Sequence, residues 1–261
     1  MARGKALITG ASSGIGEALA RQFAEKGFDL IITARRESRL QDLAEALENG
    51  GDLGGDVKVQ IVACDLSTTT GMDYLLDAID PSSIDVLVNN AGVAYPGTFP
   101  EQNFEDIASL LSLNITALTR LIHAILPSMI EKGAGRIMNV ASVASFQPVP
   151  SMSVYAASKA FVLSLTESLS EELKGSGVST TALCPGITKT DLLENLQGAQ
   201  IPPFMMSTSK EVAREGYEAL MNKEVIRIPG IANQAAVTWA KHQPRWLVRG
   251  LGGLAARFKP N

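Results

Sequence analysis

Short apolar runs alternate along the chain with longer segments whose apolar residues recur at helical spacing. The short runs are uniformly apolar, which is typical of strands buried on both faces of a sheet. Seven of them are predicted strands: Lys5–Thr9, Leu30–Ala34, Val57–Ala63, Val86–Asn89, Arg136–Val140, Thr180–Cys184 and Val225–Ile228. Six longer segments are predicted helices: Gly14–Lys26, Ser38–Glu48, Gly71–Ile79, Phe104–Glu131, Tyr155–Lys174 and Ser209–Met221. The alternation predicts right-handed βαβ units and an α/β fold with a parallel sheet covered on both faces.

No internal repeat and no long linker interrupts this pattern, so we expect residues 1–261 to form a single domain. The Gly- and acid-rich stretch Asn49–Asp56 is typical of a surface connection before the third strand. Hydrophobic residues make up 46% of the chain and charged residues 19%, which indicates a globular protein. The formal net charge of −4 gives no indication of a nucleic-acid partner.

Other sequence features argue against export, membrane insertion and metal binding. The apolar run Ala6–Ile8 behind the basic N-terminus is too short for a signal-peptide core, and no later run reaches transmembrane length. Cys64 and Cys184 lie in apolar runs without a disulfide framework, which favours a reducing, cytoplasmic compartment. His123 and His242 are far apart and have no acidic or Cys cluster beside them, so we expect no metal site.

A glycine-rich turn joins the first predicted strand to the first predicted helix. Glycines permit a tight turn and let backbone N–H groups approach a pyrophosphate, and the N-terminus of the following helix favours negative charge. An ordinary Gly-rich turn is the alternative, but the strand before and the helix after are the context that a dinucleotide-binding turn requires. The residues of this turn are Gly10, Ser12, Ser13, Gly14, Ile15 and Gly16.

The second predicted strand ends in two arginines, where NAD-preferring folds usually carry an acidic residue. Arg35, with Arg36 beside it, suits the 2′-phosphate of NADP, although two solvated charges at a helix start are the alternative. Asp65 and Leu66 follow the third predicted strand. Asp65 could hold the adenine edge, cap the next helix, or do both.

Tyr155 and Lys159 lie four residues apart in a helix-prone run, so they face the same side of the predicted helix. A nearby ammonium favours the phenolate and lowers the pKa of a tyrosine from about 10, which gives an acid that works closer to neutral pH. Such a pair also occurs on many solvated helices, so its meaning depends on the other motifs of the chain.

Those motifs follow one another from the first strand to the sixth. They are Thr9-Gly10-xxx-Gly14-x-Gly16, Asn89-Asn90-Ala91-Gly92, Asn114, Ser142, Tyr155-xxx-Lys159 and Pro185-Gly186. With this order and spacing, roughly residues 5 to 190 resemble the short-chain dehydrogenase/reductase family in its short, single-domain form. The resemblance implies a doubly wound, Rossmann-type seven-stranded sheet of order 3-2-1-4-5-6-7, with its ligands at the carboxyl ends of the strands.

The resemblance also implies a role for each catalytic candidate. Tyr155 would donate a proton to a carbonyl oxygen, and Lys159 would lower the pKa of Tyr155 and bind the nicotinamide ribose. Ser142 would hydrogen-bond the substrate oxygen, and Asn114 would hold a water that links Lys159 to solvent. The hydride would come from NADP, the expected cofactor. A strand-end turn serine and an exposed helix asparagine are the alternatives for Ser142 and Asn114.

Two residues of the implied cofactor site depart from the family pattern. Thr188 replaces an aliphatic residue, and Ser13 is not basic as in some NADP-preferring relatives. The contact at Thr188 is expected through the backbone, so the NADP preference rests on Arg35 and Arg36. The expected cofactor-binding residues are Gly10, Ser12, Ser13, Gly14, Ile15, Gly16, Arg35, Arg36, Asp65, Leu66, Asn89, Ala91, Gly92, Tyr155, Lys159, Pro185, Gly186, Thr188 and Thr190.

The segment from about residue 190 to 210 is the predicted substrate lid. Its part Ile201–Met206 combines prolines with soft apolar side chains. Val149, Pro150 and Met152 would line the other side of the pocket. We therefore expect an apolar ketone or aldehyde, such as a steroid-like, aromatic or acyl-chain substrate. A hydrophobic crossover buried in an oligomer contact is the alternative.

The tail from about residue 231 to 261 is predicted to be basic and amphipathic. No acidic residue occurs from Pro229 to Asn261. Such a stretch packs on its own core, on a neighbouring subunit, or on an anionic membrane surface. The apolar residues at helical spacing are Leu247, Leu251, Leu254 and Phe258. The basic residues on another face are Arg245, Arg249 and Lys259, and the two tryptophans are Trp239 and Trp246.

Functions of three classes fit parts of this sequence. An NADPH-dependent carbonyl reductase is the leading hypothesis, and a non-catalytic NADP-binding sensor or scaffold is the alternative. The complete set of Ser142, Tyr155 and Lys159 favours the reductase. An epimerase or dehydratase of the nucleotide-sugar type needs more C-terminal chain and a differently spaced glycine motif. A homodimer or homotetramer is expected, with the helices Phe104–Glu131 and Tyr155–Lys174 at its interface.

Overall fold

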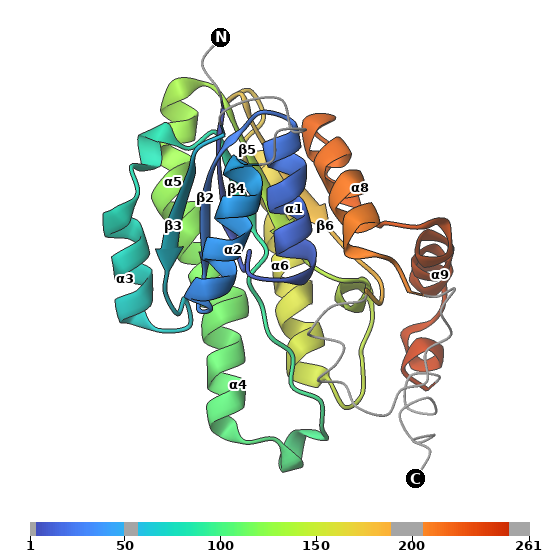
Figure 1. The fold of residues 1–261 in the computed structure, drawn as a ribbon. Helices are drawn as coiled ribbons and strands as arrows, with labels where there is room; N and C mark the ends of the chain where they lie inside the picture. Colours follow the sequence, from blue (N-terminus) through green and yellow to red (C-terminus); the bar gives the residue numbers. More distant parts are fainter. Residues whose placement is uncertain (1–3, 50–56, 189–205, 251–261) are drawn as a thin grey trace.

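The computed structural model describes residues 4–49, 57–188 and 206–250, and its strands form one parallel sheet of seven (Figure 1). Their order is β3-β2-β1-β4-β5-β6-β7, as the family resemblance implies. The fold is therefore a doubly wound, Rossmann-type α/β fold. The strands are β1 Lys5–Thr9, β2 Asp29–Ala34, β3 Val59–Ala63, β4 Val86–Asn89, β5 Gly135–Val140, β6 Val178–Leu183 and β7 Ile226–Arg227.

Helices cover both faces of this sheet (Figure 1). Neighbouring residues of a strand point to opposite faces, so Leu7 packs into a cluster with α3, α5 and α6, while Ile8 packs into a cluster with α1, α2 and α8. One layer contains α1 Gly14–Glu25, α2 Glu37–Glu48 and α8 Ser209–Met221; the other contains α3 Thr69–Ala78, α5 Leu118–Lys132 and α6 Ser153–Glu172.

The predicted continuous helix Phe104–Glu131 is interrupted by a wider turn. It consists of α4 Phe104–Leu111, a π-helical segment η3 Ser112–Ala117, and α5. Periodicity did not predict the interruption, because the apolar residues on either side of it are both spaced as in a helix. Single π-helical turns within α-helices are frequent at functional sites, and this one carries Asn114.

The run Phe104–Lys132 is long and apolar enough to cross a membrane by length and hydropathy, although sequence analysis had found no run of that length. Within it, Leu121 is 1% exposed and Ile125 is fully buried, and both belong to the core between α5 and the sheet. The run is therefore apolar because one side of it packs into the protein core.

Differences from the predicted elements are concentrated at strand ends and in short helices. Strand β3 begins two residues later than predicted, and β7 has only two residues because it lies at the sheet edge, where Val225 is 38% exposed. Helix α9 Ile231–His242 opens the predicted basic tail. The 3-10 turns η1 Pro81–Ser83, η2 Phe99–Glu101 and η4 Val143–Phe146 are too short to leave a periodic pattern. Most of the predicted lid, including Thr190, and the tail beyond residue 250 lie outside the described residues.

Candidate active site

The glycine turn after β1 is closed by contacts that leave no room for side chains. Gly10 has φ +68°, in the left-handed region that favours glycine. A Cβ on Gly10 would lie 2.8 Å from the Cα of Ala91, and a Cβ on Gly16 would lie 2.2 Å from the carbonyl oxygen of Gly10. Backbone therefore packs on backbone at the N-terminus of α1, which is the arrangement that suits an anion such as a pyrophosphate.

Thr9 and Asn90 hold this turn against the end of β4. The Thr9 hydroxyl accepts hydrogen bonds from the backbone N–H groups of Asn90 and Ala91, both at 3.0 Å. In return, Nδ2 of Asn90 donates to the carbonyl oxygens of Thr9 at 2.9 Å and Gly10 at 3.3 Å. Both residues stood in the recognised motifs, but sequence reasoning assigned neither of them a role.

The two arginines after β2 reach different neighbours. Arg36 donates to the hydroxyls of Ser12 at 3.1 Å and Ser13 at 2.6 Å, on the glycine turn. Arg35 lies 4.0 Å from the carboxylate of Asp65 in an exposed ion pair, which contributes little stability. Sequence analysis ranked Arg35 first, but Arg36 is the arginine that the structure brings onto the phosphate turn.

Asp65 forms a turn with Ser67 and does not cap α3, so the helix-cap interpretation was wrong. Its Oδ1 accepts from the backbone N–H of Ser67 at 2.9 Å and from the Ser67 hydroxyl at 2.7 Å. Thr68 then caps α3, since its hydroxyl accepts from the N–H of Gly71 at 3.0 Å. Leu66 is 5% exposed and packs into the core on the α3 side.

The Asn89 side chain belongs to a buried polar chain in the core rather than to a crevice surface. Its Nδ2 donates to Oδ1 of Asn139 at 2.9 Å, and Nδ2 of Asn139 donates to the hydroxyl of Thr166 on α6 at 2.9 Å. All three residues are at most 3% exposed. The side chain of Asn89 thus links β4, β5 and α6, and a ligand contact from Asn89 would have to come from its backbone.

Lys159 is buried at the centre of the site. It is 6% exposed, and its ammonium donates to the carbonyl oxygen of Val140 at 2.8 Å, at the end of β5. Burial of the charge lowers the pKa of Lys159 to about 8. A Cβ on Gly92 would lie 3.4 Å from Nζ of Lys159, so the glycine keeps the approach to the ammonium open.

Tyr155 and Lys159 share one face of α6, as their spacing predicted. Nζ of Lys159 lies 5.9 Å from the centre of the Tyr155 ring. Burial raises the pKa of Tyr155, and a hydrogen bond with the Ser142 side chain opposes that rise. The expectation that Lys159 lowers this pKa was wrong for this structure. The ammonium hydrogen-bonds Val140 instead, and the apolar surroundings of the phenol dominate.

Ser142 is the N-cap of η4 and lies beside Tyr155. Its hydroxyl accepts from the N–H of Ala144 at 3.1 Å, and Ser145 Oγ accepts from the N–H of Ser142 at 3.3 Å in a capping box. The Ser145 hydroxyl also donates to the carbonyl oxygen of Lys159 at 2.8 Å. The turn that orients Ser142 is therefore tied directly to α6, which carries Tyr155 and Lys159.

Asn114 is 1% exposed, so the alternative of an exposed helix residue was wrong. Its amide pairs with the backbone of Val93, accepting at 2.9 Å and donating at 3.0 Å. Its Nδ2 also donates to the hydroxyl of Ser158 at 3.2 Å, which donates to the carbonyl oxygen of Tyr155 at 2.7 Å. Asn114 thus joins the loop after β4 to the helix that carries Tyr155.

The segment after β6 closes the other side of the site. The Pro185 carbonyl accepts from the N–H of Val143 at 3.0 Å, and Thr188 bridges to Ser207. Gly186 lies directly under Asn233 of α9, because a Cβ there would meet its Oδ1 at 2.4 Å. Sequence reasoning did not single out Asn233, since nothing in the pattern of the tail indicates that it returns to the cofactor motif.

The fold and this site define a class of protein. The sheet is of the Rossmann type, and a glycine turn follows β1. Ser142 follows the carboxyl end of β5, and Tyr155 and Lys159 lie in the first turns of α6. This is the arrangement of a nicotinamide-dinucleotide-dependent oxidoreductase. A family model described as short chain dehydrogenase matches residues 4–200, which is more than half of the chain. The chain therefore belongs to the short-chain dehydrogenase/reductase family and is an oxidoreductase that uses NAD or NADP.

Individual relatives agree with this assignment. The chain is 40% identical over 189 residues to sulfoacetaldehyde reductase 2 of Chromohalobacter salexigens, covering 71% of this chain and 73% of the relative. A short-chain dehydrogenase from Sphingobium yanoikuyae in complex with NADPH has a TM-score of 0.80 and 35% identity, with 91% and 93% of the two chains covered. A Burkholderia phymatum family member in complex with NAD has a TM-score of 0.79 and 28% identity, with 90% and 92% covered.

Proposed function

We propose that this protein is an NADPH-dependent reductase of an apolar ketone or aldehyde. The observation that carries the proposal is the convergence of Ser142, Tyr155 and Lys159 on one another at the carboxyl end of the sheet. The Ser142 side chain lowers the pKa of the Tyr155 phenol, and the Lys159 ammonium lies 5.9 Å from the centre of its ring. A protein that only senses the dinucleotide has no need of a proton donor held in this way.

The proposed mechanism uses each residue where it stands. Tyr155, whose pKa is raised by burial, donates its phenolic proton to the carbonyl oxygen of the substrate. Ser142 hydrogen-bonds the same oxygen and orients it. Lys159, whose ammonium donates to the Val140 carbonyl, would bind the nicotinamide ribose. The chain through Ser158 and Asn114 fixes the turn of α6 that carries Tyr155. NADPH, when bound, supplies the hydride.

The residues around the glycine turn fit a dinucleotide. A Cβ at Gly10 or Gly16 would collide with neighbouring protein atoms, so glycine is required for the close packing of a dinucleotide-binding turn. Arg36, held on Ser12 and Ser13, would pair with the 2′-phosphate of NADP, with Arg35 beside it. The cofactor complex of the Sphingobium yanoikuyae relative contains NADPH, which supports this preference.

The apolar character of the substrate is proposed from the wall next to the catalytic turn. Phe146, Val149 and Met152 follow Ser142 and are partly buried between η4 and the start of α6. The name of the reductase from Chromohalobacter salexigens supports reduction of a carbonyl, although sulfoacetaldehyde itself is small and charged.

Consumption of NADPH and NADH with a panel of bulky and small ketones tests the proposal. We expect turnover with NADPH, loss of at least 100-fold in kcat for Ser142→Ala, and no loss for the control Ser153→Ala on the exposed start of α6. Tight NADPH binding without turnover of any ketone or aldehyde would favour the sensor or scaffold instead.

Assembly and location are further parts of the proposal. A groove of about 530 Å³ lies between α3, η3, α5 and α6, and its apolar lining includes Leu76, Ile115 and Phe161. This groove supports a homodimer or homotetramer through the predicted helices. Cys64 and Cys184 are free thiols, in keeping with the proposed cytoplasmic compartment.

The described part of the basic tail exposes Trp239 and Trp246, at 51% and 67%. Contact of this tail with an anionic membrane surface is a second proposal about partners. Sedimentation with anionic vesicles at low salt tests it, and Trp239→Glu should reduce the bound fraction while Tyr74→Glu, on exposed α3, should not. Full-length protein that stays in the supernatant would contradict the contact.

A further inference from the structure

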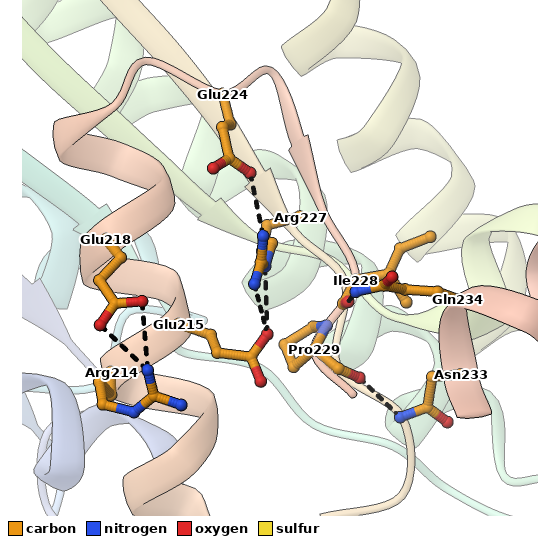
Figure 2. Close-up of polar contacts among 9 residues, drawn as sticks. All are labelled: Arg214, Glu215, Glu218, Glu224, Arg227, Ile228, Pro229, Asn233 and Gln234. Carbon is orange, nitrogen blue, oxygen red and sulfur yellow. Dashed lines mark hydrogen bonds and ion pairs between the residues drawn. The ribbon is translucent and has the colours of Figure 1, made fainter. Parts of the chain in front are cut away.

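Helix α9 is fixed to the body of the protein at its first turn. Nδ2 of Asn233 donates to the carbonyl oxygen of Pro229 at 2.8 Å, and Nε2 of Gln234 donates to that of Ile228 at 2.9 Å (Figure 2). Asn233 also packs against Gly186 of the proposed cofactor loop. The start of α9 is thus held beside the catalytic end of the sheet.

Strand β7, which precedes α9, is itself tied to α8. Arg227 donates to Glu215 at 2.9 Å and to Glu224 at 3.4 Å, and the first of these pairs is partly buried (Figure 2). The acidic side chains of this region are therefore engaged with Arg227 or, for Glu218, with Arg214 at 3.0 Å.

Lys241 lies on the inner face of α9. Gln234, Val237 and Lys241 are spaced by three and four residues, which places them on one side of the helix. Val237 is 6% exposed and Gln234 bonds the preceding loop, so this side faces the protein. The opposite side carries Ile231 and Trp239, which are 85% and 51% exposed. The Lys241 side chain is itself exposed and lies at the solvent edge of this side of α9.

The ammonium of Lys241 lies over the ring of Phe146, 4.5 Å from its centre. Phe146 ends η4, whose N-cap is Ser142, so one 3-10 turn separates this cation from the hydroxyl that orients the substrate oxygen. Strand β4 lies between β1, which the glycine turn follows, and β5, which Ser142 follows. Lys241 therefore lies on the Ser142 side of the sheet.

The charges of Lys159, Glu167 and Lys241 all act on Cys184, which follows β6. Burial raises the pKa of Cys184 to about 12, and the charges of Lys159 and Lys241 both oppose that rise, while Glu167 adds to it. Both ammonium groups thus act on the same region after β6. No Asp or Glu in the described parts of the chain forms an ion pair with Lys241, and none occurs in the sequence from Pro229 to Asn261.

We propose that Lys241 binds an anionic group of the substrate, a carboxylate, sulfonate or phosphate, at a position beyond Phe146 from the reacting carbonyl. The inference rests on the proposed reductase function and narrows its substrate class to ketones or aldehydes that have both an apolar body and an anionic group. The Phe146 ring holds the ammonium in place without neutralising it, so the full charge faces an incoming anion.

Matched pairs of ketones test this role of Lys241. The acids 4-oxo-4-phenylbutanoate and 5-oxodecanoate would be compared with their methyl esters, using NADPH at saturation. We expect wild-type enzyme to have the higher kcat/KM for the acids. Lys241→Gln should lower the acid-to-ester ratio of kcat/KM by about tenfold, mainly through KM, because one charged contact is lost.

Two further variants separate charge from structure. Lys241→Arg should keep most of the preference for the acids, and Lys210→Gln, on the exposed start of α8, should not change the ratio. An unchanged ratio in Lys241→Gln, or a wild-type preference for the esters, would overturn the inference. Absence of NADPH oxidation with every acid and ester would instead overturn the proposed function on which it rests.

Discussion

The nucleotide side and the substrate side of this site are built in different ways. Around the glycine turn, backbone packs on backbone, and a Cβ on Gly16 would lie 2.2 Å from a carbonyl oxygen. Around Phe146 and Lys241, side chains of a 3-10 turn and a late helix meet at 4.5 Å, with solvent nearby. The first arrangement tolerates almost no substitution, as we expect for a site that binds a cofactor shared by a whole family. In the second arrangement single side chains can be substituted without disturbing the backbone, as we expect for a site that binds one particular substrate.

The strongest test of this contrast is Gly16→Ala. The new methyl group would collide with the Gly10 carbonyl and the Asn90 amide, neither of which can move away. We expect the free energy of unfolding to fall by about 3 kcal/mol and dinucleotide binding to be lost. Urea unfolding and NADPH titration measure the two effects. Gly133→Ala is the control, because that site is open and only its φ of +65° is unfavourable, at a cost of about 1 kcal/mol.

Lys159→Met should stabilise the protein while removing its activity. The pKa of Lys159 is lowered from 10.5 to about 8, so below pH 8 the folded protein carries the full cost of a buried charge. Between pH 8 and 10.5 the folded state loses this proton before the unfolded state does, so that cost disappears as pH rises. The variant should gain about 1–3 kcal/mol at pH 7 and less toward pH 10. Equal stability of the two proteins across this range would contradict the burial argument.

Arg36→Ala sharpens the comparison at the edge of the nucleotide side. If Arg36 pairs with the 2′-phosphate, KM for NADPH should rise about tenfold while KM for NADH stays the same. Arg35→Ala should have the smaller effect, and Arg39→Ala, on the exposed side of α2, should have none. Steady-state kinetics with both cofactors decides between the two arginines, and a larger effect of Arg35→Ala would restore the order that the sequence suggested.

The difference between the two sides also explains how much the sequence could predict. Strand order, the glycine turn and the meeting of Ser142 with Tyr155 were predictable, because local spacing and a shared motif order determine them. The positions of Asn233 and Lys241 were not, since they depend on how a tail helix packs back over Gly186. The raised pKa of Tyr155 could not be predicted from the sequence either, because it depends on burial of the phenol rather than on the spacing to Lys159.

The order of the two arginines was also beyond what the sequence determines. Sequence places Arg35 and Arg36 next to each other after β2, and only the path of the backbone into α2 decides which one reaches Ser13. The π-helical turn at Asn114 is a similar case, since a sequence with regular apolar spacing gives no sign of a single wide turn.

The central claim is that the phenol of Tyr155 delivers the proton that completes carbonyl reduction. Tyr155→Phe removes one oxygen atom and leaves the ring in place, so kcat with NADPH and a good ketone, measured beside the dissociation constant for NADPH, tests the claim directly. We expect kcat to fall by about 10²–10⁴-fold while NADPH binds within about threefold of the original affinity. A variant that reduces the ketone at the original rate would contradict the account.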